Sequence, residues 1–153
     1  MKKKITPYTV VILVFLLTAC LHKDNPLSDF GIVYFDGGKY AAIAEYYGSK
    51  TEVRIPTKNK ELPVTLIVAK AFAGKNIISI NIPDSVTEIG FCAFYNNPLM
   101  KKITIPDNVN ITEAIVDFED PYYTFPYGFT TFYKSQGSKA GTYIYSNGIW
   151  RIK

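Results

Sequence analysis

The chain repeats one short pattern, and this repetition is the strongest constraint on its fold. Ile-Pro-Asp-Ser-Val-Thr-Glu-Ile-Gly begins at Ile82, and Ile-Pro-Asp-Asn-Val restarts the pattern 23 residues later at Ile105. A looser copy, Val-Arg-Ile-Pro, occupies residues 53–56. A unit this short cannot bury its own apolar face, so successive units must stack side by side. The sequence therefore predicts a mainly β fold built on a short solenoid of about three rungs.

Each unit also carries an Ala-Phe pair after its strand. Ala71-Phe72 and Ala93-Phe94 lie 22 residues apart, and both pairs are predicted to pack on the far side of the rungs. In the third copy Asp117-Phe118 is interpreted as the equivalent pair. The loss of the alanine there is expected where a stack of repeats ends.

The predicted strands alternate apolar and polar residues, which sends the two kinds of side chain to opposite faces. The inward positions are Val53, Ile55, Ile80, Ile82, Ile103 and Ile105. The outward positions form a polar column of mixed charge: Arg54, Asn81 and Thr104, with Glu52, Ser79 and Lys102 beside them. This column is a candidate surface for a protein partner, and an ordinary solvated sheet face is the alternative.

A capping hairpin is predicted for residues 30–51, ahead of the repeat region at residues 52–118. Strand-like runs at Phe30–Phe35 and Tyr40–Tyr47 flank Asp36-Gly37-Gly38, which is a turn signal. The hairpin would cover the first rung and hide an open sheet edge.

An aromatic C-terminal β cap is predicted for residues 119–153. Phe132-Tyr133 is interpreted as a strand, and Asn147-Gly148 suits a type I′ hairpin turn that pairs Tyr145 with Trp150. Before this hairpin comes a stretch that either covers the last rung or forms an exposed interface or carbohydrate platform. Its residues are Tyr122, Tyr123, Phe125, Tyr127 and Phe129.

The first residues predict an export signal that ends at a lipid anchor. A basic start precedes the apolar run at residues 10–17, which is too short to span a bilayer, so residues 1–19 are interpreted as a signal peptide. Leu17-Thr18-Ala19-Cys20 resembles the lipobox of bacterial lipoproteins, in which Cys20 would be lipidated. Ordinary signal cleavage is the alternative. Residues 20–29 are polar and are interpreted as a lipid-anchored tether.

The net charge of the chain argues against one class of partner, and its cysteine content argues against an internal disulfide. Removing residues 1–19 leaves 14 basic and 13 acidic residues, a net charge of +1, which does not suit nucleic-acid binding. If Cys20 carries lipid, Cys92 is the only thiol left, so no internal disulfide can form. No cation flanks Cys92 in the sequence, and a buried structural thiol is expected.

The sequence offers no arrangement that predicts catalysis. His22 is the only histidine and lies in the tether, which excludes a histidine-based triad or a multi-histidine metal site within one chain. An acidic cluster could hold calcium, but its spacing favours a solvated loop. Its residues are Asp117, Glu119 and Asp120. We therefore expect no enzyme activity, no metal and no cofactor.

Residues 82–94 closely resemble the BspA-like leucine-rich repeat of bacterial surface proteins, in particular those of treponemes and oral anaerobes. That unit reads roughly Ile-x-Ile-Pro, Ser-Val-Thr-x-Ile-Gly and x-x-Ala-Phe. The resemblance covers about half of the chain after residue 19 and implies a surface-exposed or periplasmic repeat protein. Some relatives bind extracellular-matrix or host proteins, and others promote adhesion between cells.

These observations predict an exported lipoprotein of the bacterial cell envelope, anchored through Cys20 at the outer membrane or the cell surface. Its expected function is a protein-binding or adhesion module. The expected partner is a host extracellular-matrix protein or another bacterial surface protein. The alternative is a structural envelope lipoprotein without a host ligand.

Overall fold

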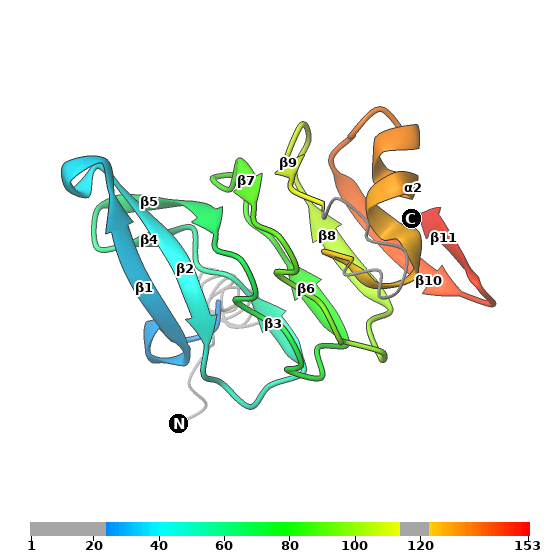
Figure 1. The fold of residues 1–153 in the computed structure, drawn as a ribbon, viewed down its shortest axis with the longest axis horizontal. Coiled ribbons are helices and arrows are strands. Elements are labelled where there is room, and N and C mark those ends of the chain that lie inside the picture. The colour runs from blue at the N-terminus through cyan, green and yellow to red at the C-terminus, as the bar shows by residue number, and fades with distance from the viewer. Residues whose placement is uncertain (1–23, 114–122) are drawn as a thin grey trace, which may run out of the picture.

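The repeats stack into a short solenoid in the computed structural model, which describes residues 24–113 and 123–153 (Figure 1). Two sheets run along its length. In order of pairing, the first sheet contains β11 (Ile149–Ile152), β10 (Gly141–Ser146), β8 (Lys102–Ile105), β6 (Ser79–Asn81) and β3 (Glu52–Arg54). The second contains β1 (Phe30–Phe35), β2 (Tyr40–Tyr46), β5 (Leu62–Ile67), β7 (Glu88–Ile89) and β9 (Asn110–Ile111), with β4 (Lys58–Asn59) paired to β5. The predicted mainly β solenoid is confirmed.

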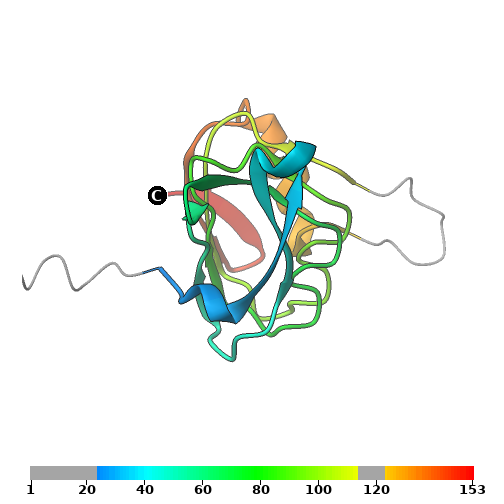
Figure 2. The ribbon, with the colours of Figure 1, turned by 90° about the vertical axis from the view of Figure 1, so that its left-hand side faces the viewer.

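Three successive rungs are aligned in register, and their inner residues form the core. Strands β3, β6 and β8 are parallel, and Val53, Ile80 and Ile103 lie side by side. All three of these side chains are buried, as are Ile55, Ile82 and Ile105 at the ends of the same strands. The inward positions predicted from the alternating pattern are therefore confirmed. Viewed along the solenoid, the rungs lie one behind another (Figure 2).

The phenylalanines of the Ala-Phe pairs stack into an aromatic column, defined here as Tyr46, Phe72, Phe94 and Phe125. Consecutive ring centroids lie 5.4, 5.0 and 4.5 Å apart, and all three pairs are stacked. The predicted role of Asp117-Phe118 is corrected, because Thr124-Phe125 takes the third place. Phe94 N–H donates to Thr124 O at 2.9 Å, just as Phe72 N–H donates to Ala93 O at 2.8 Å. Asp117-Phe118 itself lies outside the described residues.

Asn97 joins two rungs through its side chain. Its Oδ1 accepts the Ile77 N–H at 2.8 Å, and its Nδ2 donates to Phe72 O at 2.9 Å and to Phe94 O at 2.8 Å. The residue is fully buried. A buried amide that satisfies three main-chain groups replaces hydrogen bonds that the irregular turns cannot make for themselves.

Gly90 is required by close approach between rungs. A Cβ at this position would lie 2.6 Å from Ala69 N and 3.0 Å from Val68 C, which are backbone atoms of the preceding rung. Any larger residue would push two rungs apart.

The N-terminal hairpin covers the first rung as predicted. Strands β1 and β2 are antiparallel, with Phe30 opposite Tyr46 and Phe35 opposite Tyr40. Strand β2 then pairs in parallel with β5, so the hairpin continues the second sheet (Figure 1). The side chains of Ala41 and Ile43 are fully buried in the core.

The described part of the predicted tether is not free. Asn25 is buried, and a 3-10 helix, η1, spans Leu27–Asp29. Asn25 Nδ2 also donates to Asp29 Oδ2 at 2.9 Å. The tether prediction is therefore corrected from Asp24 onward, because this segment packs onto the first rung. Residues 1–23, with the predicted signal peptide, Cys20 and His22, lie outside the described residues.

The C-terminal cap contains a helix where Phe132-Tyr133 was interpreted as a strand. Helix α2 spans Phe129–Ser135, after the 3-10 helix η3 at Pro126–Gly128. Phe129 and Tyr133 stand one helical turn apart, both are fully buried, and their rings stack at 5.9 Å. The helix face that carries Phe129 and Tyr133 buries both rings against the last rung. The free energy gained by this burial outweighs the strand propensity of the threonines and aromatic residues. The cap is therefore α and β, not β alone.

The C-terminal hairpin has the predicted register. Tyr145 lies opposite Trp150 and Tyr143 opposite Ile152. Asn147 and Gly148 have φ values of 52° and 80°, as a type I′ turn requires. Strand β10 also pairs antiparallel with β8, so the hairpin extends the first sheet instead of standing alone.

Buried hydroxyl and thiol groups stay protonated in the core. Burial raises the pKa of Tyr46, Tyr133 and Tyr143, whose hydroxyls donate to main-chain oxygens at 3.1, 2.7 and 2.6 Å. Burial also raises the pKa of Cys92, which is fully buried and is the free cysteine of the described residues. This supports the structural role expected for Cys92.

No helix in residues 24–113 or 123–153 has the length and apolar character to cross a membrane.

Candidate protein-binding cleft

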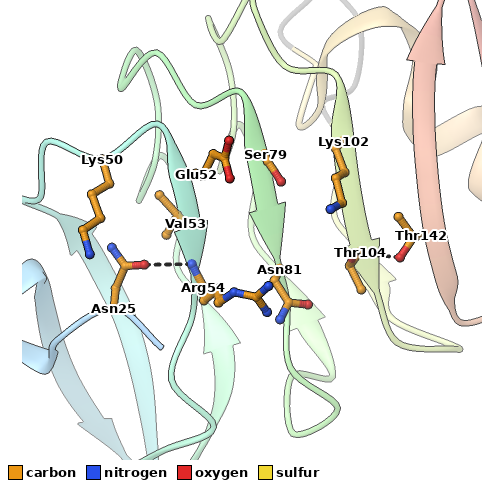
Figure 3. Close-up of a pocket in the computed structure, with 10 residues that line it drawn as sticks. All are labelled: Asn25, Lys50, Glu52, Val53, Arg54, Ser79, Asn81, Lys102, Thr104 and Thr142. Carbon is orange, nitrogen blue, oxygen red and sulfur yellow. Dashed lines mark hydrogen bonds between the residues drawn. The ribbon is translucent and has the colours of Figure 1, made fainter. Parts of the chain in front are cut away.

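The six residues of the predicted polar column lie on one face of the first sheet and line one cleft (Figure 3). The register sets them in two rows. Glu52, Ser79 and Lys102 form the first row. Arg54, Asn81 and Thr104 form the second row. The structure therefore brings together every side chain that the alternating pattern singled out, and their role in binding stays a prediction.

Four further residues complete the cleft, which has a volume of about 430 Å³, and Val53 of β3 is one of them. Asn25 and Lys50 stand beside β3, and Thr142 of β10 stands beside β8. Thr142 Oγ1 and Thr104 Oγ1 share a hydrogen bond of 2.9 Å. Thr142 lies opposite Thr104 because the C-terminal hairpin joins the first sheet. The sequence pattern does not predict this pairing, and therefore it does not identify Thr142. No sequence signal distinguishes Asn25 from the other polar residues around it.

Asn25 closes the outer edge of β3. Its main-chain N–H donates to Arg54 O at 3.1 Å, and its Oδ1 accepts the Arg54 N–H at 2.9 Å. One residue thus supplies the donor and the acceptor that a neighbouring strand would offer. Because β10 pairs with the opposite side of β8, the outward side chains are the main groups that this part of the sheet offers to a ligand.

The charged groups of the cleft are not neutralised by one another. Lys50, Arg54 and Lys102 are positive and Glu52 is negative, which gives this set a net charge of +2. Among the described residues, the ion pairs are Lys39–Asp36, Lys58–Glu61 and Lys75–Glu45, all outside the cleft. The Arg54 side chain extends across the cleft toward Asn81 (Figure 3).

The aromatic stretch before the C-terminal hairpin is divided between core and surface. Phe125 and Phe129 are buried and cover the last rung. Tyr123 and Tyr127 are 48% and 45% exposed, and they line a smaller hollow of about 210 Å³. Tyr122 lies outside the described residues. The capping interpretation is correct for the phenylalanines.

Residues 24–113 and 123–153 contain no group of three or more His, Cys, Asp or Glu side chains that could hold a metal ion. The acidic cluster considered for calcium lies outside these ranges. Its residues are Asp117, Glu119 and Asp120.

Comparisons with known proteins agree with this architecture. Residues 46–116 match the family described as BspA type leucine rich repeat region (6 copies). The crystal structure of a leucine-rich repeat protein from T. pallidum is 28% identical with a TM-score of 0.57, and the match covers 60% of this chain and 44% of that one. A leucine rich cell surface protein from Faecalibacterium prausnitzii is 29% identical with a TM-score of 0.49, over 59% of this chain and 25% of that one. The curated proteins include no match.

This chain spans less than half of the length of the T. pallidum protein, so the likeness concerns the repeat region and not a whole protein. The matched segment begins at the end of β2 and includes strands β3 to β9. Residues 46–116 are therefore similar to leucine-rich repeat regions of the BspA type.

Proposed function

We propose that the protein binds a protein partner through the polar cleft while it is anchored to the bacterial cell envelope by lipid on Cys20. The repeat family supports a protein-interaction module in general. The observation that carries the proposal is the cleft itself. Rigid parallel strands hold Arg54, Asn81 and Thr104 in one half-buried row that lines the cleft and is aligned by the register of three rungs.

The proposed partner is another protein of the bacterial surface or a host extracellular-matrix protein. A polar face of mixed charge suits a protein surface better than an apolar small molecule. Adhesion between cells is the proposed outcome of such binding.

Replacing Arg54, Asn81 and Thr104 together with alanine should reduce capture of the partner at least about tenfold, since central interface residues carry most of the binding energy. Capture is measured by pulldown from extracts of host matrix and of bacterial surface proteins. The melting temperature should change by only a few degrees, because all three side chains point away from the core.

The matched control is a triple alanine variant at Glu88, Asn110 and Thr112, three exposed residues on the second sheet or directly after it. It should leave capture unchanged. Equal capture by both triple variants, with folding intact, would count against the cleft as the binding surface.

Lipid anchoring predicts that cells fed a radioactive fatty acid will label the wild-type protein and not Cys20→Ala. The physical reason is that a thiol at this position is the proposed attachment site. Two acyl chains would hold the protein on the membrane, at about 0.8 kcal/mol for each buried methylene. Equal labelling of both proteins would disprove attachment at Cys20.

Protease treatment of intact cells distinguishes two locations of the protein. A protein exposed on the cell surface is degraded, whereas a structural protein in the periplasm survives.

A further inference from the structure

The cleft combines three properties that together select one class of partner segment. Its cations outnumber its carboxylates, most of its side-chain hydrogen-bonding groups have no partner among the described residues, and the main chain beside it is occupied at Arg54 and along β8. This inference rests on the proposed function, because it identifies what the partner places in the cleft.

The positive groups are free to take a ligand carboxylate. Arg54 and Lys102 stand on β3 and β8, with β6 between them. Neighbouring strands lie about 4.8 Å apart, and the two positions belong to different rows, about 6.6 Å apart along the strands, so the diagonal between them is about 12 Å. Long side chains from both sides can reach one anionic group placed over β6. Neither side chain has an ion pair or hydrogen bond among the described residues.

The floor between these cations is neutral and polar. Asn81 and Ser79 project from β6, and the hydroxyls of Thr104 and Thr142 bond to each other at one side. Amide and hydroxyl groups can donate to a carboxylate oxygen or to the main chain of an extended peptide. The volume of about 430 Å³ lies within the range of ligand pockets, which is about 300–1,000 Å³.

Glu52 argues against a polyanion. Its carboxylate lies in the same row as Lys102, two strands away, and has no cation partner among the described residues. A densely sulfated glycan would set one of its charges close to Glu52. A peptide that carries one carboxylate avoids this repulsion and can place a neutral or basic side chain there.

Asn25 and β10 restrict binding by strand addition at this part of the sheet. Asn25 occupies the hydrogen-bonding groups of Arg54, and β10 occupies the far side of β8. Recognition is therefore expected to use the side chains on the face of the sheet. We propose that the cleft binds an acidic segment of the protein partner, with one carboxylate held between Arg54 and Lys102 above Asn81.

The test measures fluorescence anisotropy of labelled threonine-rich nonapeptides with the purified full-length protein in detergent micelles. Three peptides differ only at the central residue, which is Glu, Gln or Lys, and a sulfated hexasaccharide is the fourth probe. The Glu peptide should bind at least about fivefold more tightly than the Gln peptide at low salt, and this preference should shrink in 0.5 M salt.

Lys102→Gln should remove most of the preference for the Glu peptide, whereas Lys101→Gln should preserve it. Lys101 is an exposed neighbour of Lys102 that does not line the cleft. Glu52→Gln should strengthen binding of the Glu peptide and of the hexasaccharide. Thermal melting of each variant verifies that folding is unchanged.

Equal binding of the three peptides, or no measurable binding of any, would overturn the acidic-segment proposal. Tighter binding of the hexasaccharide than of the Glu peptide would overturn it in favour of a glycan. These outcomes leave the proposed function standing if the triple alanine variant still loses its partner. Conversely, unchanged partner capture by that variant would overturn the proposed function even if the Glu peptide binds.

Discussion

Replacing Phe94 with alanine should lower the free energy of unfolding by about 3–5 kcal/mol. Phe94 is fully buried at the centre of the aromatic column, stacked on Phe72 at 5.0 Å and on Phe125 at 4.5 Å. The substitution removes the buried ring, leaves a cavity between two rungs and deletes two aromatic contacts, each worth about 0.5–1.5 kcal/mol. Domains of this size have about 5–15 kcal/mol of stability in total, so the loss is a large share.

Urea unfolding followed by circular dichroism measures this effect. Phe35→Ala is the matched control, because Phe35 is 40% exposed near the tip of the N-terminal hairpin. We expect it to cost about 1 kcal/mol or less. A cost below about 1.5 kcal/mol for Phe94→Ala would mean that the column is not a main source of cohesion between rungs.

The second large effect is expected for Asn97→Ala, at about 2–4 kcal/mol. The alanine leaves the Ile77 N–H and the carbonyl oxygens of Phe72 and Phe94 without the partners that Asn97 supplies. Each buried main-chain group without a partner costs about 1–3 kcal/mol, although relaxation or an entering water recovers part of this. Urea unfolding gives the total, and hydrogen exchange at the Ile77 amide reports the local loss.

Asn110→Ala is the matched control, since Asn110 is an exposed asparagine on β9. It should change the free energy of unfolding by about 0.5 kcal/mol or less. Asn97→Asp separates the two roles of the amide. It keeps an acceptor for Ile77 but faces two carbonyl oxygens with a carboxylate, so it should be at least as destabilising as alanine at pH 7. If the aspartate variant is as stable as wild type, the bonds to Phe72 and Phe94 are not important.

The regular part of the fold could be predicted because its determinants are local. Alternation places Ile80 and Ile103 inward and Asn81 and Thr104 outward, and one register then aligns the outward residues of successive rungs. The Asn147-Gly148 turn likewise fixes the pairing of the last hairpin. For the same reason the alternating pattern by itself identifies the six side chains of the polar column.

The remaining features depend on contacts between distant segments. Asn97 precedes a proline, which is typical of a turn, and only the neighbouring rung shows why its amide is buried. Thr124-Phe125 completes the column 31 residues after Phe94 instead of 22, a spacing that breaks the repeat. Helix α2 forms because the last rung needs an apolar cover, which strand propensity alone does not reveal.

The docking of Asn25 onto β3 determines how far the cleft can stand from a lipid anchor. Asn25 is the fifth residue after Cys20, and a fully extended chain gains at most about 3.6 Å per residue. With lipid on Cys20, the wall of the cleft would lie within about 18 Å of the bilayer surface. A binding partner would then have to approach almost to the lipid headgroups, which favours a membrane neighbour or a slender, extended chain over a bulky globular one.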